Sequence, residues 1–131
     1  KVAYSFVQKE GASEIFDFSI VCYSNDSKIK FLNAGKIISK YGVVSMEVAN
    51  IMLKKIQKFT SSNKRLRLSC TGYASENLSC DNIDVGTVYI GIGIGNKSKI
   101  IKKKFKNKGR VSIINKTVET LINESVKILS Q

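Results

Sequence analysis

Residues 85–105, VGTVYIGIGIGNKSKIIKKKF, carry the clearest structural pattern of the chain. The apolar run Val85–Ile94 predicts a long strand, and Gly86 near its start allows a close approach of backbone. The dipeptide Gly95-Asn96 predicts a tight turn, after which residues 97–105 return as a second strand. The sequence therefore predicts a β-hairpin that closes the sheet.

Helices and one more strand flank this hairpin in the sequence. Residues 111–129 predict a helix, and one face of it carries Ile114, Val118, Leu121, Ile122, Ser125 and Leu129. Residues 66–70 alternate between apolar and polar side chains, which is typical of a half-buried strand. Ser45 is a favourable N-cap, and the apolar spacing after it predicts a helix over 46–59.

The first half of the chain alternates between helix and strand patterns. Residues 1–10 read as the end of a helix, and Phe16–Tyr23 is an apolar run that predicts a strand. Ser24 then caps a helix, and a short helical turn follows around 37–40. Residues 71–84 form a polar loop, and a loop of that length inside a compact domain is often functional.

These elements predict an α/β fold, a three-layer α/β/α sandwich with a mixed sheet in one domain over residues 1–131. A chain of 131 residues is one domain by length, and it buries enough surface to need neither a disulfide nor a structural metal. No apolar run approaches the roughly 20 residues that cross a bilayer. We therefore expect a protein without a membrane partner.

Cysteine and histidine content excludes several kinds of chemistry. There are three cysteines and no histidine. Zinc sites of the usual Cys/His kinds are therefore not expected, and Ser-His-Asp or Cys-His catalysis lacks its base. Cys22 and Cys70 end apolar runs and are interpreted as core residues, and free thiols suit the reducing cytoplasm.

The net charge is +12, from 22 Lys+Arg against 10 Asp+Glu, which raises the possibility of nucleic-acid binding. Most of these cations are lysines spread along the chain. The one dense cluster, at residues 102–108, falls in an expected exposed strand and turn. Because the aromatic residues do not interleave with the cations, the sequence disfavours a nucleic-acid interface.

Three ordered segments resemble the C-terminal domain of the CinA family: residues 21–28 (VCYSNDSK), 41–49 (YGVVSMEVA) and 85–90 (VGTVYI). Residues 69–74 (SCTGYA) are similar to the family's Thr-Gly-Ile-Ala-Gly-Pro turn. Gly109-Arg110 stands where the family has an arginine before its last helix. The resemblance covers nearly the whole chain, and the ordered set is more specific than any one segment.

This resemblance implies a nicotinamide mononucleotide amidohydrolase, which releases ammonia from the carboxamide and leaves nicotinate mononucleotide. Such an enzyme would serve pyridine-nucleotide salvage, act on a small nucleotide substrate, need no cofactor and form a homo-oligomer. The family is described as using a serine nucleophile, a lysine base and a nearby tyrosine. By motif, the tyrosine is Tyr23 and the lysine is Lys28.

The residues are consistent with this chemistry in their own right. Amide hydrolysis needs a nucleophile, a base and donors for the oxyanion. Since histidine is absent, a lysine is the leading base, and either partial burial or a neighbouring cation must lower its pKa toward neutrality. Tyr23, at the carboxyl end of an expected strand, is placed to relay a proton or to hold Lys28. The candidate substrate-binding residues are Ser24, Asn25, Thr71, Gly72 and Arg110, of which the last three are candidates for a phosphate.

Two departures from the family pattern leave the function open. The family's nucleophile lies in a Glu-Ser-x-Thr-Gly-Gly turn, which aligns immediately upstream of Lys1, and neither Ser5 nor Ser24 replaces it. Residues 73–77 lack the glycine and proline of the family's turn. The alternatives are an active amidohydrolase with its serine upstream of Lys1, a catalytically degenerate relative that binds a nucleotide or a protein, and a basic nucleic-acid-binding protein.

Overall fold

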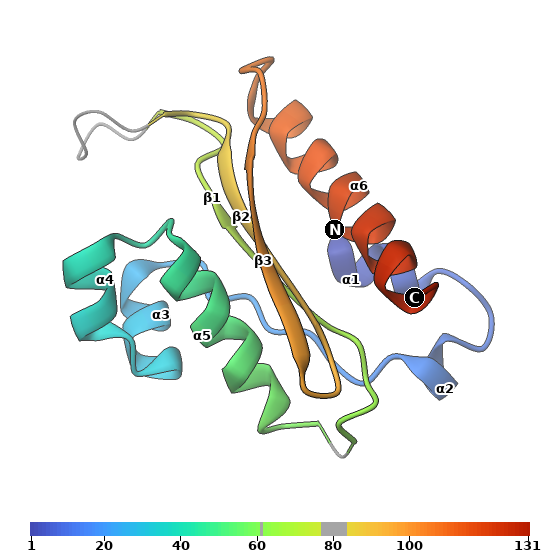
Figure 1. The fold of residues 1–131 in the computed structure, drawn as a ribbon. Helices are drawn as coiled ribbons and strands as arrows, with labels where there is room; N and C mark the ends of the chain where they lie inside the picture. The colour runs from blue at the N-terminus through green and yellow to red at the C-terminus, as the bar shows by residue number, and fades with distance from the viewer. Residues whose placement is uncertain (61, 77–83) are drawn as a thin grey trace.

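The computed structural model describes residues 1–60, 62–76 and 84–131 (Figure 1). Its centre is a three-stranded antiparallel sheet of order β1-β2-β3, with bounds β1 Arg67–Gly72, β2 Thr87–Ile94 and β3 Lys97–Lys104. The predicted hairpin is confirmed, because β2 and β3 pair in register across Gly95-Asn96. Positions 61 and 77–83, which include Cys80 and much of the predicted loop, lie outside the described residues.

The helices are α1 Val2–Val7, α2 Ala12–Ile15, α3 Asn25–Leu32, α4 Gly35–Tyr41, α5 Met46–Gln57 and α6 Arg110–Leu129. The two predicted N-caps are confirmed. Ser24 Oγ accepts a hydrogen bond from the Ser27 amide at 3.0 Å, and Ser45 Oγ accepts one from the Val48 amide at 3.3 Å. Each bond satisfies an amide that has no partner within its helix.

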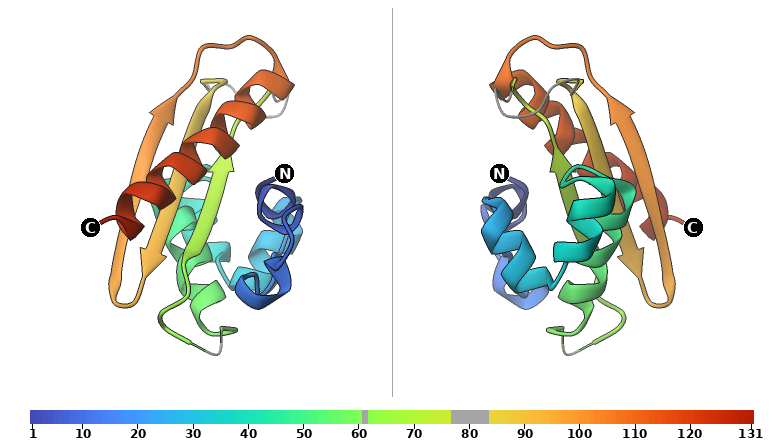
Figure 2. Two further views of the ribbon diagram at one scale, coloured as in Figure 1. Left: turned by 90° about the vertical axis from the view of Figure 1, so that its right-hand side faces the viewer. Right: turned by 90° about the vertical axis from the view of Figure 1, so that its left-hand side faces the viewer.

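Two long helices cover the two faces of the sheet (Figure 2). On one face α5 contacts all three strands, and its own residues Val48, Ala49 and Leu53 are buried against the sheet. On the other face α6 packs over β2. The core there consists of Val88, Ile90, Ile92, Ile113 and Leu121. The predicted three-layer, single-domain α/β/α class is therefore confirmed.

The shorter helices lie outside these layers. Helices α3 and α4 pack against α5, and α1 joins the α6 face through Val2. At the start of the chain Lys1 Nζ donates a hydrogen bond to Asn115 Oδ1 of α6 at 2.6 Å. None of the helices in the described residues is long and apolar enough to span a membrane.

Close contacts explain why glycine stands at position 86, just before β2, and at position 91 within it. A Cβ at Gly86 would overlap the Phe105 carbonyl, which confirms the predicted close approach of backbone. A Cβ at Gly91 would overlap Ser69 Oγ and lie 2.8 Å from Leu53 Cδ1. The bare backbone at Gly91 therefore lets α5 lie directly on the sheet.

The predicted strand Phe16–Tyr23 is wrong. These residues are extended, but within the described chain no backbone hydrogen bond joins residues 17–23 to a strand. Side chains hold the segment instead, through ring contacts of Phe16 with Phe6 and of Phe18 with Phe59. The predicted mixed sheet is wrong as well, because both strand pairs of the described sheet are antiparallel.

Candidate functional site

The candidate site lies at the end of the sheet where β1 ends and where β2 and α6 begin (Figure 1). The extended segment before α3 reaches this end, and Tyr23 is its last residue before the cap of that helix. Three of the predicted residues, Tyr23, Lys28 and Arg110, meet here through hydrogen bonds.

Arg110 connects two segments that are far apart in the sequence. Its Nη2 donates to the Tyr23 hydroxyl at 2.9 Å, and its Nη1 donates to Ser75 Oγ at 3.2 Å. Ser75 follows β1, so the guanidinium spans from the loop after β1 to the segment before α3. Arg110 and both of its partners are exposed, which leaves the cluster open to a ligand from solvent.

Lys28 lies on the first turns of α3 and folds back over the preceding residues. Its Nζ donates to the Tyr23 carbonyl at 2.8 Å. Partial burial lowers the pKa of Lys28 from its ordinary value, and the coulombic effect of the nearby Cys22 sulfur opposes that shift. A lysine with a lowered pKa supplies a neutral amine at lower pH than a solvated lysine, as a general base requires.

Ser24 and Asn25 lie beside these residues at the start of α3. The Ser24 hydroxyl is committed to capping, and its carbonyl accepts from the Ser27 hydroxyl at 2.8 Å. Asn25 is exposed, and it begins the helix. Ser24 therefore has a local structural role, while the side chain of Asn25 faces solvent at the site.

Thr71 and Gly72 have structural roles at the end of β1. Thr71 is 7% exposed, and its hydroxyl donates to the Val43 carbonyl at 2.8 Å. A Cβ at Gly72 would lie 2.7 Å from Val88 Cγ2, so the strands approach too closely for a side chain there. These two residues shape this end of the sheet, and only Gly72 is exposed to solvent.

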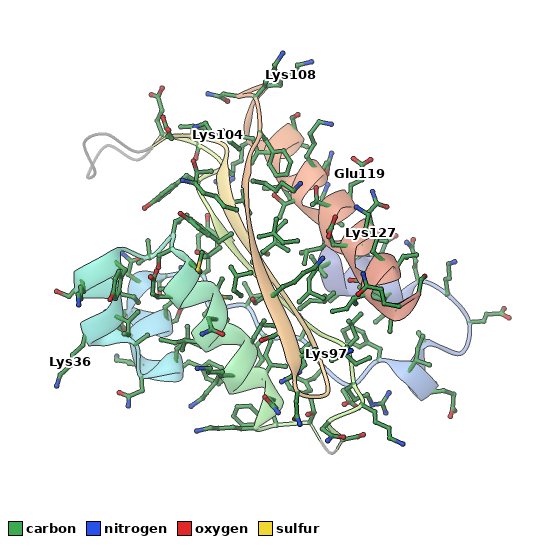
Figure 3. All side chains as sticks on the ribbon, viewed as in Figure 1. Lys36, Lys97, Lys104, Lys108, Glu119 and Lys127 are labelled. Carbon is green, nitrogen blue, oxygen red and sulfur yellow. The ribbon has the colours of Figure 1, made fainter. Side chains whose placement is uncertain are left out.

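The electrostatics of this end favour an anionic ligand. The N-termini of α5 and α6 both lie at this end, where Figure 3 shows Lys104 and Lys108. Lys104 pairs with Asp84 at 3.5 Å, and Lys108 has no ion pair among the described residues. Helix N-termini carry a partial positive charge, so dipoles and side chains attract anions to the same place.

Sequence reasoning missed Ser75, because an exposed serine in a loop has no distinguishing local pattern. Within the described chain, no hydroxyl or thiol is hydrogen bonded to Lys28 Nζ. No group of three or more residues of the metal-ligating types His, Cys, Asp and Glu occurs in that part of the chain either. What the structure brings together is therefore a lysine of lowered pKa, a tyrosine and an exposed arginine.

Comparisons with known proteins identify the family of this chain. The CinA C-terminal domain family matches residues 1–129. The chain belongs to this family. A CinA-like protein of Fusobacterium nucleatum is 37% identical over 131 residues, which is 99% of this chain and 31% of that protein. A CinA-like protein of Kosmotoga olearia is 36% identical over 102 residues, covering 77% of this chain and 24% of that protein.

Solved structures have the same fold. The competence/damage inducible protein CihA from Agrobacterium tumefaciens superimposes with a TM-score of 0.86 at 25% identity, covering 99% of this chain and 78% of that one. A competence or damage-inducible protein from Enterobacter asburiae gives a TM-score of 0.88 at 19% identity, covering 98% of this chain and 79% of that one. This CinA C-terminal domain spans less than a third of the length of these curated relatives.

Proposed function

We propose that this CinA C-terminal domain is a nicotinamide mononucleotide amidohydrolase with Lys28 as its base. The observation that carries the proposal is the double role of Tyr23. Its carbonyl accepts from the Lys28 amine, and its hydroxyl accepts from Arg110. One residue therefore links a lysine of lowered pKa to an exposed guanidinium that can bind phosphate.

The proposed reaction is an acyl transfer to a serine and then to water. A serine supplied from outside residues 1–131 attacks the carboxamide carbon and passes its proton to Lys28 Nζ. The C–N bond breaks, and ammonia leaves with that proton. Water then hydrolyses the ester and releases nicotinate mononucleotide. In this scheme Arg110 and the cationic end of the sheet hold the phosphate of the substrate.

The test measures ammonia release from nicotinamide mononucleotide by the full natural polypeptide that contains this sequence. Lys28→Arg keeps the positive charge but stays protonated, so we expect binding to persist and hydrolysis to fall by at least about 100-fold. Lys30→Arg is the matched control, because Lys30 is exposed on the same helix and pairs with Asp26. Equal hydrolysis by wild type and Lys28→Arg would contradict the proposed base.

The pH profile sharpens this test. Because burial lowers the folded pKa of Lys28, its amine loses its proton at a lower pH than in the unfolded chain. We expect kcat to rise with pH through that lowered pKa and to level off below 10.5, the value for an unperturbed lysine. A rate that keeps rising up to pH 10.5 would show an unperturbed lysine or hydroxide in place of this base.

The second candidate function is nucleotide binding without catalysis. It is favoured by the loop after β1, which lacks the glycine and proline of the family's turn. In that loop the Ser75 hydroxyl accepts one of the hydrogen bonds that Arg110 donates. Calorimetric titration with nicotinate mononucleotide measures binding, and the ammonia assay with nicotinamide mononucleotide measures catalysis. Binding without ammonia release supports the degenerate relative, and binding with release supports the enzyme.

We also propose that the domain self-associates. Large apolar side chains are exposed along the first 23 residues, at Tyr4, Val7, Ile15, Ile20, Val21 and Tyr23. Contiguous exposed apolar surface is typical of an interface. Sedimentation velocity at micromolar concentration measures the oligomeric state, and a single monomeric species would contradict this proposal.

A further inference from the structure

A second arginine lies at the opposite end of the sheet, under the β2–β3 turn. Arg67 begins β1, and its residue is only 5% exposed. Its Nη2 donates to the Gly95 carbonyl at 2.6 Å, while its Nε is buried without a hydrogen-bond partner. Among the described residues no carboxylate forms an ion pair with it. A buried cation in this state is costly and calls for a compensating anion.

The neighbouring buried residues of β1 differ from Arg67, because their polar groups all have hydrogen-bond partners. Arg67, Ser69 and Thr71 are the three buried residues of the strand. The Ser69 hydroxyl donates to the Ala49 carbonyl at 2.8 Å, and the Thr71 hydroxyl donates to the Val43 carbonyl at 2.8 Å. Both hydroxyls are satisfied by the chain itself. The Arg67 guanidinium alone retains an unused buried donor.

The guanidinium borders a cavity of about 220 Å³ between α5 and the hairpin turn. Leu53 and the Gly95 backbone form part of its wall, and the side chains that can contact a ligand are Asn50, Lys54, Gln57, Arg67, Asn96 and Ser98. None of the described lining residues is acidic. Two are cationic and four carry neutral hydrogen-bonding groups, which is the donor set that binds an oxyanion.

We propose that this cavity binds a small oxyanion, a phosphate or a carboxylate, paired with Arg67. The cavity is smaller than the 300 Å³ or more that is typical of drug-sized ligands, so a small ion or the anionic group of a metabolite fits it best. Arg67 supplies the guanidinium charge at the cavity wall, and Lys54 supplies a second positive charge. The site lies at the hairpin end, where Figure 3 shows Lys97, away from Lys104 and Lys108 at the other end.

The test follows thermal unfolding while sodium phosphate or sodium malonate replaces sodium chloride at constant pH and ionic strength. At a tenfold excess over Kd we expect Tm to rise by about 4 °C. If only phosphate or only malonate raises Tm, the effective ion shows which kind of oxyanion the cavity accepts. Amide NMR signals of Gly95, Asn96 and Ser98 should shift with the same Kd.

Variants assign the response to this cavity. Arg67→Met should abolish the shift, while Arg65→Met removes an arginine two positions away and should keep it. Arg110→Met removes any phosphate response of the proposed nucleotide site and should keep the shift that Arg67→Met abolishes, which separates the two sites. If Arg67→Met fails to fold, Asn50→Leu removes a hydrogen-bonding group from the cavity wall with Arg67 in place and should reduce the shift. A wild type that responds to phosphate and malonate no more than to chloride, or an equal response in the cavity variants, would overturn the proposal.

Discussion

The β1 side of the sheet has two kinds of neighbour. On one edge β1 pairs with β2 in continuous register from Arg67↔Gly93 to Gly72↔Val88. Beyond the other edge of β1, the segment Phe16–Tyr23 passes the sheet (Figure 2). It makes no backbone hydrogen bond to any described strand. Two arginines hold this segment near its two ends. Arg65 Nη1 donates to the Ile15 carbonyl at 2.8 Å, and Arg110 binds the Tyr23 hydroxyl.

The two neighbours of β1 are held by different kinds of contact. Main-chain hydrogen bonds along the whole register hold β1 beside β2. The unpaired segment depends on a few side-chain contacts, and one of them, at Tyr23, is also the centre of the candidate site. A segment attached in this way is positioned by a few polar and aromatic contacts, and we expect it to open more readily than the paired strands.

Hydrogen exchange should show the largest difference between the two neighbours. The Ile90 amide lies in the central strand, so its opening should cost close to the global free energy of unfolding, about 5–15 kcal/mol. The amides of Ile20 and Val21 have no backbone partner among the described residues and should open for about 0–2 kcal/mol. Native-state exchange by NMR measures both, and comparable protection would mean that the segment is paired.

Core substitution should give the next largest difference. Leu53 is 2% exposed beneath the sheet at Gly91, so Leu53→Ala should destabilise the fold by about 2–5 kcal/mol. Ile20 is 39% exposed in the unpaired segment, so Ile20→Ala should cost less than about 1 kcal/mol. Urea unfolding of the two variants measures both values. Equal losses would show that the segment contributes to the core as a strand does.

The same contrast explains what the sequence predicted. The hairpin, α5 and α6 were predicted to within about two residues, because turn chemistry, N-caps and apolar period are local signals. Phe16–Tyr23 has the composition of a strand, but pairing depends on where a partner edge lies, and the sequence does not encode that locally. Tyr23, Lys28 and Arg110 came from motifs. Ser75 and the buried state of Arg67 depend on tertiary contacts, which no local pattern reveals.

The two arginine anchors should differ in their effect on ligand binding. Under the proposed function, Arg110→Met removes a charged donor to phosphate and should weaken nicotinate mononucleotide binding by about 1.5–3 kcal/mol, at least tenfold. Arg65→Met removes the other anchor, with its 3.4 Å ion pair to Asp17, and should leave that affinity unchanged. Calorimetric titration of both variants decides. Equal weakening would mean that the segment as a whole, and not Arg110, determines binding.

The smallest expected effect tests a side-chain anchor within the paired part of the fold. Glu124 of α6 accepts from Lys127 at 2.7 Å and from Lys99 of β3 at 2.9 Å, so it ties the edge strand to the helix. These hydrogen bonds, first from Lys127 and then from Lys99, lower the pKa of Glu124 to about 2 from an ordinary value of 4.5. Both lysine side chains are well exposed, so the contribution should stay below about 1 kcal/mol.

The sign of its pH dependence follows from the lowered folded pKa. The stabilisation is fully present above pH 4.5 and is lost as the pH falls toward 2, because the unfolded chain then binds a proton that the folded chain does not. Glu124→Gln should therefore lower Tm at pH 6, and its difference from wild type should shrink by pH 3. Glu119→Gln, on the same helix and without an ion pair among the described residues, should show no such trend. If the Glu124→Gln difference were independent of pH, the ion pairs with the two lysines would add nothing, and β3 would be held by its backbone pairing with β2.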